Sequence, residues 1–310
     1  MNIRKIHRSF ITSRVPMIIA VLIFIALRIP WIDDGEALEL AASTLIQIGT
    51  ALFLLHFTQK YTIIQQRTLL PAFFYLLLVG TNSLFFYDLR GSIAAFLILF
   101  CLWILFDTYQ NPLSQRSVLN ISLVLTLGSF YWPPLLWFFP LLWHGMYQLK
   151  SLNIRTFFAS LMGLAVVGLF LFAWSVYKND WLVFIQIVPD FRALWDFRIP
   201  SLASIKETVT NIFLVIMFTL AVFNIFIVGV AEKAQARTFL GYLSVLTVAV
   251  SILFLGQNQW EKEWLLILYV PLSIVLAHYF TLSQRLSTVW LFLLTVLFFL
   301  AKIFLSSFIQ

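Results

Sequence analysis

Residues 15–42 read VPMIIAVLIFIALRIPWIDDGEALELAA, an apolar run that gives way to an acidic stretch before the next apolar run begins. Four carboxylates, Asp33, Asp34, Glu36 and Glu39, fall within seven positions there. A helix needs roughly 20 apolar residues to cross the hydrocarbon core of a bilayer. The stretch therefore predicts a membrane protein whose first two spans are joined by an acidic loop.

The rest of the chain has the same character. Of its 310 residues, 62% are hydrophobic and 11% are charged, whereas a soluble domain is about 45–50% apolar and about 25% charged. These values predict an all-α, polytopic helical membrane protein with about 11 transmembrane helices, forming a single integral membrane domain over residues 1–310. The apolar runs are 15–32, 37–58, 69–87, 91–109, 117–131, 133–149, 156–177, 208–230, 238–257, 264–282 and 286–308.

The fifth and sixth runs meet at Tyr131-Trp132-Pro133-Pro134. A proline pair cannot continue a helix without loss of backbone hydrogen bonds. Two interpretations of residues 117–149 follow. They form either two short spans joined by a tight turn or one broken helix that does not cross fully.

The charged residues predict an orientation. If the basic leader at residues 1–14 is cytoplasmic, cytoplasmic segments hold 12 of the 20 Lys and Arg residues, and the outer side holds 11 of the 13 acidic residues. This is the positive-inside pattern. It predicts a multi-pass protein of the bacterial inner membrane with its N-terminus inside and its C-terminus outside. Residues 177–207, rich in Trp and Phe with interspersed charges, predict an amphipathic segment on the outer face.

Several function classes are disfavoured. The net charge of +7 comes from short loops and not from a basic face with exposed aromatic residues, so no nucleic-acid partner is predicted. The four histidines are scattered, and no metal site or cofactor is predicted from them. Span interiors are nearly free of ionisable groups, which argues against a proton-coupled transporter.

The acidic cluster suggests a site for chemistry on a lipid-linked substrate. Asp33 or Asp34 would take a proton from an acceptor hydroxyl as a general base. Arginines match phosphate oxygens in a bidentate way, so those of the outer rim would hold a lipid phosphate. The candidate substrate-binding residues are Arg28, Glu36, Asp88, Arg90, Arg192 and Arg198.

Each candidate also has a purely structural interpretation. An acidic outer loop satisfies topology, and Asp34 or Gly35 would simply cap the second helix. Asp88 and Arg90 would form a local ion pair in a tight loop. Residues 261–263, Glu-Lys-Glu, are most simply a solvated turn.

The segment LRIPWIDDGEALELA, residues 27–41, resembles the first-loop signature of GT-C glycosyltransferases, which use polyprenyl-phosphate sugars. The order of segments over residues 69–180 is also similar to the GT-C membrane module. The chain resembles, in addition, an uncharacterised family of bacterial envelope membrane proteins that share LLPAFFYLLL, residues 69–78, and GSFYWPPLL, residues 128–136.

The GT-C resemblance implies that Asp33 or Asp34 is the catalytic base and that Asp88 is a second acidic group on the facing loop. It implies transfer of a sugar from a polyprenyl-phosphate donor to an envelope acceptor at the outer face. Two alternatives remain open. One is a non-catalytic membrane subunit or lipid-handling component with an envelope protein partner, and the other is a transporter or flippase.

Overall fold

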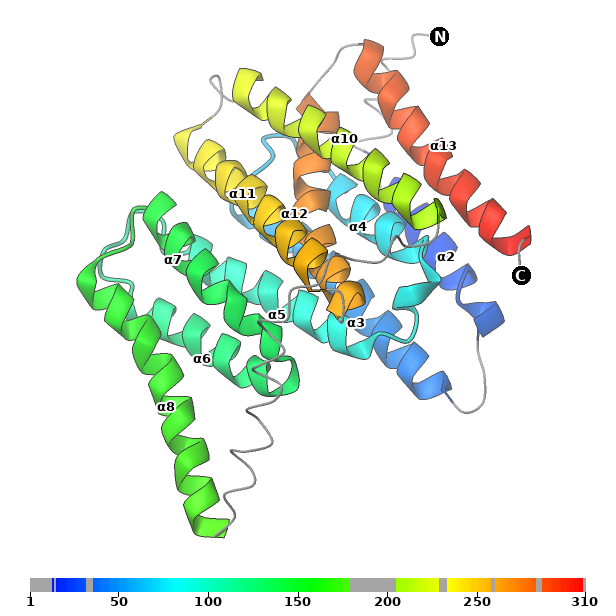
Figure 1. The fold of residues 1–310 in the computed structure, drawn as a ribbon. Helices are drawn as coiled ribbons and strands as arrows, with labels where there is room; N and C mark the ends of the chain where they lie inside the picture. The colour runs from blue at the N-terminus through cyan, green and yellow to red at the C-terminus, as the bar shows by residue number, and fades with distance from the viewer. Residues whose placement is uncertain are drawn as a thin grey trace.

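The computed structural model describes residues 13, 15–31, 36–178, 205–228, 233–257, 260–282 and 286–308, and the secondary-structure elements within them are all helices. Figure 1 shows their arrangement. In chain order they are α2 (Val15–Ala26), η1 (Ile29–Trp31), α3 (Ala37–Lys60), α4 (Leu70–Gly80), η2 (Ser83–Phe85), α5 (Leu89–Phe106), α6 (Gln115–Tyr131), η3 (Pro133–Trp137), α7 (Phe138–Gln148), α8 (Ile154–Lys178), α10 (Ile205–Val228), α11 (Ala234–Gly256), α12 (Glu261–Leu282) and α13 (Leu286–Phe308).

Each predicted apolar run coincides with one of these α-helices, so the all-helical class is confirmed. Among the described residues, six helices are long and apolar enough to cross a membrane, namely α3, α5, α8, α10, α11 and α12. The total of 11 spans and the GT-C-like arrangement stay predictions. The basic leader, except Ser13, and residues 179–204 of the predicted outer segment lie outside the described residues.

The core of the molecule is built around α12. Residues 264–281 of this helix are all buried, and α4, α5, α10 and α11 pack against it. Aromatic contacts join it to its neighbours, as where the rings of Phe74 and Phe280 stack with centroids 5.4 Å apart. A helix that is apolar on every side can be covered by protein or by lipid, and here protein covers it.

The proline pair begins η3, the short 3-10 helix that separates α6 from α7, so the α-helix is interrupted at Trp132; whether residues 117–149 form two spans or one broken helix stays a prediction. Trp132 ends α6, and η3 follows at once. The indole of Trp132 is fully buried and lies edge-to-face against Trp264 of α12 at 4.8 Å. The 11 residues of α7 extend only about 16 Å, which is about half of the hydrocarbon core. Helix α7 by itself is therefore too short to span, and η3 adds five helical residues before it.

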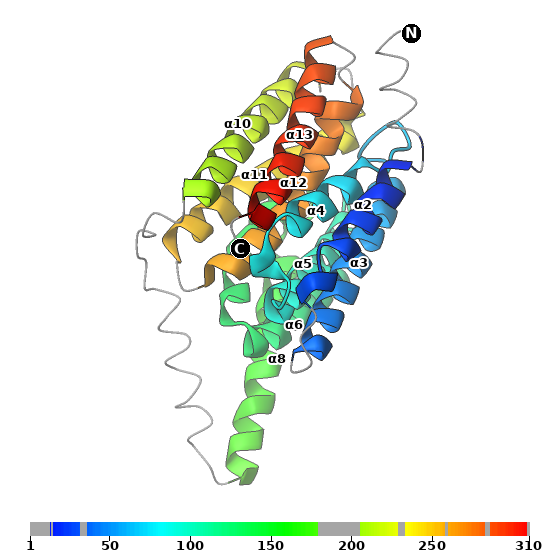
Figure 2. The ribbon, with the colours of Figure 1, turned by 90° about the vertical axis from the view of Figure 1, so that its right-hand side faces the viewer.

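Helix ends gather in two groups. We call the group where α2 and α4 finish and α5 and α12 begin the Asp88 end of the bundle. At the other end, Lys60 and Asp107 join the last turns of α3 and α5 by an ion pair of 2.9 Å. Helix α8 packs on α6 and then projects beyond the bundle (Figures 1 and 2). The assignment of these two ends to the outer and cytoplasmic sides of the membrane stays a prediction.

Candidate functional site at the Asp88 end

Some of the predicted site residues lie in the described part of the chain, and others lie outside it. Glu36 is exposed and is the N-cap residue of α3, although its side chain makes no capping hydrogen bond. Asp34 and Gly35, the caps that the structural alternative named, lie outside the described residues, so that alternative stays untested. The structure places Arg28, Asp88 and Arg90 at one end of the bundle. Four predicted residues lie outside the described residues: Asp33, Asp34, Arg192 and Arg198.

Asp88 is the N-cap residue of α5. Its Oδ1 accepts the backbone N–H of Gly91 at 2.8 Å. Its Oδ2 is buried and has no hydrogen-bond partner within the described part of the chain. A side chain at position 91 would collide with this oxygen, so glycine there lets the carboxylate fold over the helix end. The predicted local ion pair with Arg90 does not form, because no N–O distance between them is within 4.0 Å.

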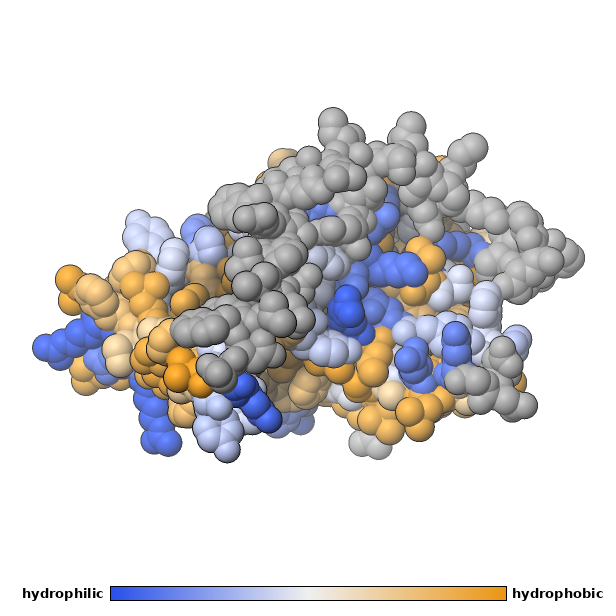
Figure 3. Space-filling model, turned by 60° about the horizontal axis from the view of Figure 1, so that its bottom comes forward, coloured by the Kyte–Doolittle hydropathy of each residue, from blue (hydrophilic) through white to orange (hydrophobic). Residues whose placement is uncertain are grey.

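The surroundings of Asp88 change its acidity. Burial raises the pKa of the carboxyl group above its usual range, while the Gly91 amide and the charges of Lys262 and Arg90 act in the opposite direction. Glu263, on the first turn of α12, also interacts electrostatically with Asp88. A carboxyl group with a raised pKa exchanges protons closer to neutral pH than an ordinary aspartate does. Hydrophilic side chains gather at this end of the molecule (Figure 3).

Arg28, predicted on the rim, is buried, with 3% of its surface exposed. Its guanidinium group donates to Thr44 Oγ1 and to Gln47 Oε1, each at 2.5 Å. It also packs against the rings of Phe24 and Phe86, at 4.0 and 4.9 Å from their centroids. No carboxylate of the described residues lies within 4.0 Å of it. Burial of a cation without a nearby counter-charge costs desolvation free energy. The hydrogen bonds and the two aromatic rings offset part of that cost here.

Gln47 connects this arginine to the start of α5. Its side-chain amide donates to Ser92 Oγ at 2.7 Å and to the carbonyl of Phe85 at 3.0 Å. Ser92 Oγ in turn donates to the backbone carbonyl of Asp88 at 2.6 Å. The structure therefore brings two predicted residues, Arg28 and Asp88, into one polar network. Gln47 and Ser92 were missed, because polar residues inside apolar runs gave no sign of which partners they meet.

The first turn of α12 completes the site. The solvated turn predicted for residues 261–263 is wrong, because these residues begin a helix. Acidic residues favour a helix N-terminus, and this signal was present in the sequence. The adjoining Trp264 is buried and donates its Nε1–H to Gln257 Oε1 at 3.1 Å. Glu263 is half-buried and faces the α5 cap, so this turn supplies a second carboxylate near Asp88.

Arg90 is exposed at the same end. Its guanidinium carbon lies 5.9 Å from the ring centroid of Tyr131, the last residue of α6. The arginine is free of any ion pair within the described ranges. It is thus an accessible cation near Asp88, as is the exposed Lys262, and it is placed to meet a phosphate group, whereas Arg28 is enclosed.

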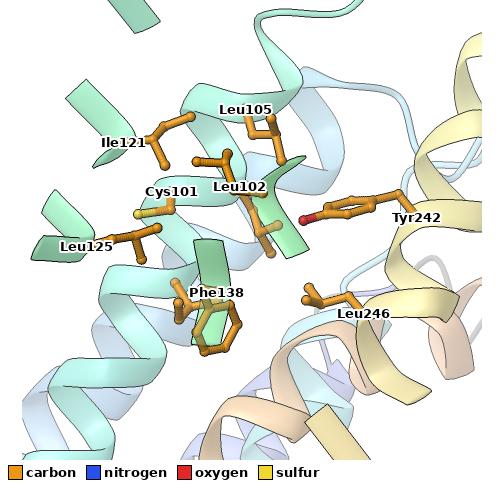
Figure 4. Close-up of a pocket in the computed structure, with 10 residues that line it drawn as sticks. Cys101, Leu102, Leu105, Ile121, Leu125, Phe138, Tyr242 and Leu246 are labelled. Carbon is orange, nitrogen blue, oxygen red and sulfur yellow. The ribbon is translucent and has the colours of Figure 1, made fainter. Parts of the chain in front are cut away.

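A small cavity elsewhere in the core does not add to the site. It lies among α5, α6, α7 and α11, where Cys101 and Tyr242 face it from opposite sides (Figure 4). Its volume is about 20 Å³, which is room for about one water molecule. The Tyr242 hydroxyl donates to the carbonyl of Leu141 at 3.2 Å. The other residues that line the cavity are apolar, so it affects packing but offers no group of polar side chains for binding or catalysis.

Comparison with known proteins gives a family without an activity. The model of DUF6427, a family of unknown function, matches residues 5–306. The match covers nearly the whole chain, and the chain therefore belongs to this family. No curated protein and no solved structure matches it.

Proposed function

For this member of the DUF6427 family, we propose a GT-C-like glycosyltransferase. It moves a sugar from a polyprenyl-phosphate donor to an envelope acceptor at the outer face of the bacterial inner membrane. The observation that carries the proposal is the carboxylate of Asp88. One of its oxygens caps α5, and the other is buried without a hydrogen-bond partner among the described residues, beside the exposed Arg90.

The capping role does not need a charge. Asparagine caps helices as well as aspartate does, and a partly buried carboxylate costs desolvation free energy. The helix dipole and the nearby charges of Lys262 and Arg90 offset part of this cost, but desolvation of the carboxylate is the larger effect. The Oδ2 atom is an acceptor that the helix cap leaves unused among the described residues, which supports a role in binding a substrate hydroxyl.

The proposed reaction uses the residues in distinct roles. Asp33 or Asp34 accepts the proton of the acceptor hydroxyl while that oxygen bonds to the anomeric carbon of the sugar. The bond from this carbon to the phosphate oxygen breaks, and its electron pair leaves with the lipid phosphate. Asp88 holds a hydroxyl of the sugar or acceptor, and Arg90 binds the phosphate in a bidentate way.

A transfer assay tests this function. The full chain, in liposomes with an envelope lipid extract, is given a panel of radiolabelled polyprenyl-phosphate hexoses. We expect transfer with one donor, and its loss on Asp33→Asn, Asp34→Asn or both together. The control is Asp107→Asn, at the opposite end of the bundle. Unchanged transfer in the double variant would exclude this mechanism.

One feature favours the non-catalytic subunit as a second candidate. The outer half of α8 exposes large apolar side chains beyond the bundle, with Phe170 74% and Tyr177 80% exposed. Such a helix can pack against a helix of a partner protein. Stoichiometric co-purification of one envelope protein from native membranes, lost on Phe170→Ala, supports this candidate. A partner-free monomer in mild detergent contradicts it.

A further inference from the structure

Helices α6 and α8 begin side by side at the end of the bundle that holds Lys60, which we call the Lys60 end. Both helices run from there toward the opposite end (Figure 1). Ser122 Oγ of α6 donates to the backbone carbonyl of Ser160 of α8. Nearer the helix starts, Asn153 Nδ2 donates to the carbonyl of Pro112 at 2.6 Å. The first turns of the two helices are therefore neighbours.

Each of these two helices carries an exposed arginine in its first turn. Arg116 is the second residue of α6 and Arg155 is the second residue of α8, and the exposed Lys150 precedes α8. No carboxylate of the described residues lies within 4.0 Å of these three cations. A cation near a helix N-terminus opposes the helix dipole, and neighbouring cations repel each other. Membrane topology accounts for positive charge in a cytoplasmic loop, but it does not require that charge at two adjacent helix starts.

The N-terminus of α6 lacks the cap that α8 has. Asn153 Oδ1 accepts the backbone N–H of Thr156 at 2.8 Å and so caps α8. Ser114, the N-cap residue of α6, makes no capping hydrogen bond, and its buried Oγ has no partner in the described part of the chain, although only 4% of the residue is exposed. The first N–H groups of a helix have no partner within the helix itself, and those of residues 115–117 have no acceptor among the described residues. The start of α6 therefore holds several unused hydrogen-bond donors.

We propose that the adjacent starts of α6 and α8 bind a phosphate group. The N–H groups and the dipole of a helix N-terminus favour phosphate oxygens, and arginine binds them in a bidentate way. In this site, Arg116 and Arg155 contact the phosphate from two helices, while Ser114 and the unused N–H groups of α6 donate to it. The phosphate belongs to the headgroup of an anionic phospholipid or to a free phosphate compound. The site lies at the opposite end of the bundle from Asp88, so it does not rest on the proposed sugar transfer.

Two double variants with the same loss of charge form a matched pair for the test. Arg116→Gln with Arg155→Gln removes the arginines of the site, whereas Arg67→Gln with Arg237→Gln removes two exposed arginines outside α6 and α8. Isothermal titration calorimetry of the full chain in neutral detergent measures binding of glycerol 3-phosphate and of dihexanoyl phosphatidylglycerol. We expect one saturable site in the wild type. The first pair should lower the affinity about tenfold or more, because it removes charge-assisted hydrogen bonds, and the second pair should leave it nearly unchanged.

The two probes distinguish the sources of the phosphate. Tighter binding of phosphatidylglycerol assigns the site to a lipid headgroup, and tighter binding of glycerol 3-phosphate assigns it to a free phosphate compound. Ser114→Ala, which changes no charge, should also weaken binding, and wild-type affinity in this variant overturns the role of the α6 N-terminus. The absence of saturable binding of both probes by the wild type, or an equal loss in the two double variants, overturns the site. Thermal unfolding should show an equal or higher midpoint for Arg116→Gln with Arg155→Gln, because glutamine does not oppose the helix dipole.

Discussion

Two substitutions of Asp88 distinguish its role as the N-cap of α5 from the role of its negative charge. Asparagine keeps an oxygen that can accept the Gly91 N–H, whereas alanine removes it. Loss of an N-cap costs about 1 kcal/mol, within a range of about 0.5–2 kcal/mol. At a pH below the folded pKa of Asp88 we therefore expect Asp88→Ala to lower the free energy of unfolding by about 1 kcal/mol and Asp88→Asn to leave it within about 0.5 kcal/mol of the wild type.

The pH dependence gives a sharper test of the same residue. Burial raises the pKa of Asp88 in the folded chain, whereas an unfolded aspartate titrates near about 3.9. Between these two pKa values the folded chain binds more protons than the unfolded chain. The contribution of Asp88 to stability is thus fully present below about pH 3.9 and falls as the pH rises through the folded pKa. Asp88→Asn should lack this fall.

Denaturant unfolding in detergent, followed by tryptophan fluorescence between pH 4 and pH 8, measures both effects. Transfer activity is measured on the same preparations. A hydrogen bond to a charged group contributes about 1.5–3 kcal/mol, so Asp88→Asn should lower transfer by roughly 10- to 100-fold while stability is kept. The reasoning is refuted if Asp88→Asn is as unstable as Asp88→Ala, or if it keeps both the wild-type pH slope and full transfer.

Three further predictions concern packing and charge. Gly145→Ala should destabilise the fold by about 1–3 kcal/mol in thermal unfolding, because a Cβ atom there would lie 2.8 Å from the Tyr242 ring. The control Gly168→Ala should be neutral or stabilising in the same experiment, because a Cβ atom there would have nothing within 4 Å. Gln47→Leu should cost about 2 kcal/mol or more in denaturant unfolding, since it removes hydrogen bonds to a buried cation, and a loss below about 0.5 kcal/mol would contradict this. Asp107→Asn should change stability by less than about 1 kcal/mol, with a loss that shrinks as salt is added, because its ion pair with lysine is about 35–46% exposed.

The sequence by itself determined the helices and the places where they break. Apolar length is a local property, so each apolar run contains a helix, and the proline pair after Trp132 begins the 3-10 helix that interrupts two of them. The charge pattern predicts two sets of loops, since acidic and basic residues are rare and occur between the apolar runs. It also directed attention to Asp88 and Arg90, which do lie together at one end of the bundle.

Only the tertiary structure decided which helix is central and which polar residues meet. Most of these helices are apolar on several faces, so hydrophobic periodicity does not show that protein surrounds α12 while α13 lies at the side of the bundle. Arg28 was expected to be exposed on the outer rim. It is buried instead, because its guanidinium group donates hydrogen bonds to Thr44 and Gln47 of α3. Glu263 joins Asp88 although the two are far apart in the chain. These contacts depend on which helices pack together. Helices that are apolar on all sides have no sequence periodicity that predicts their packing partners.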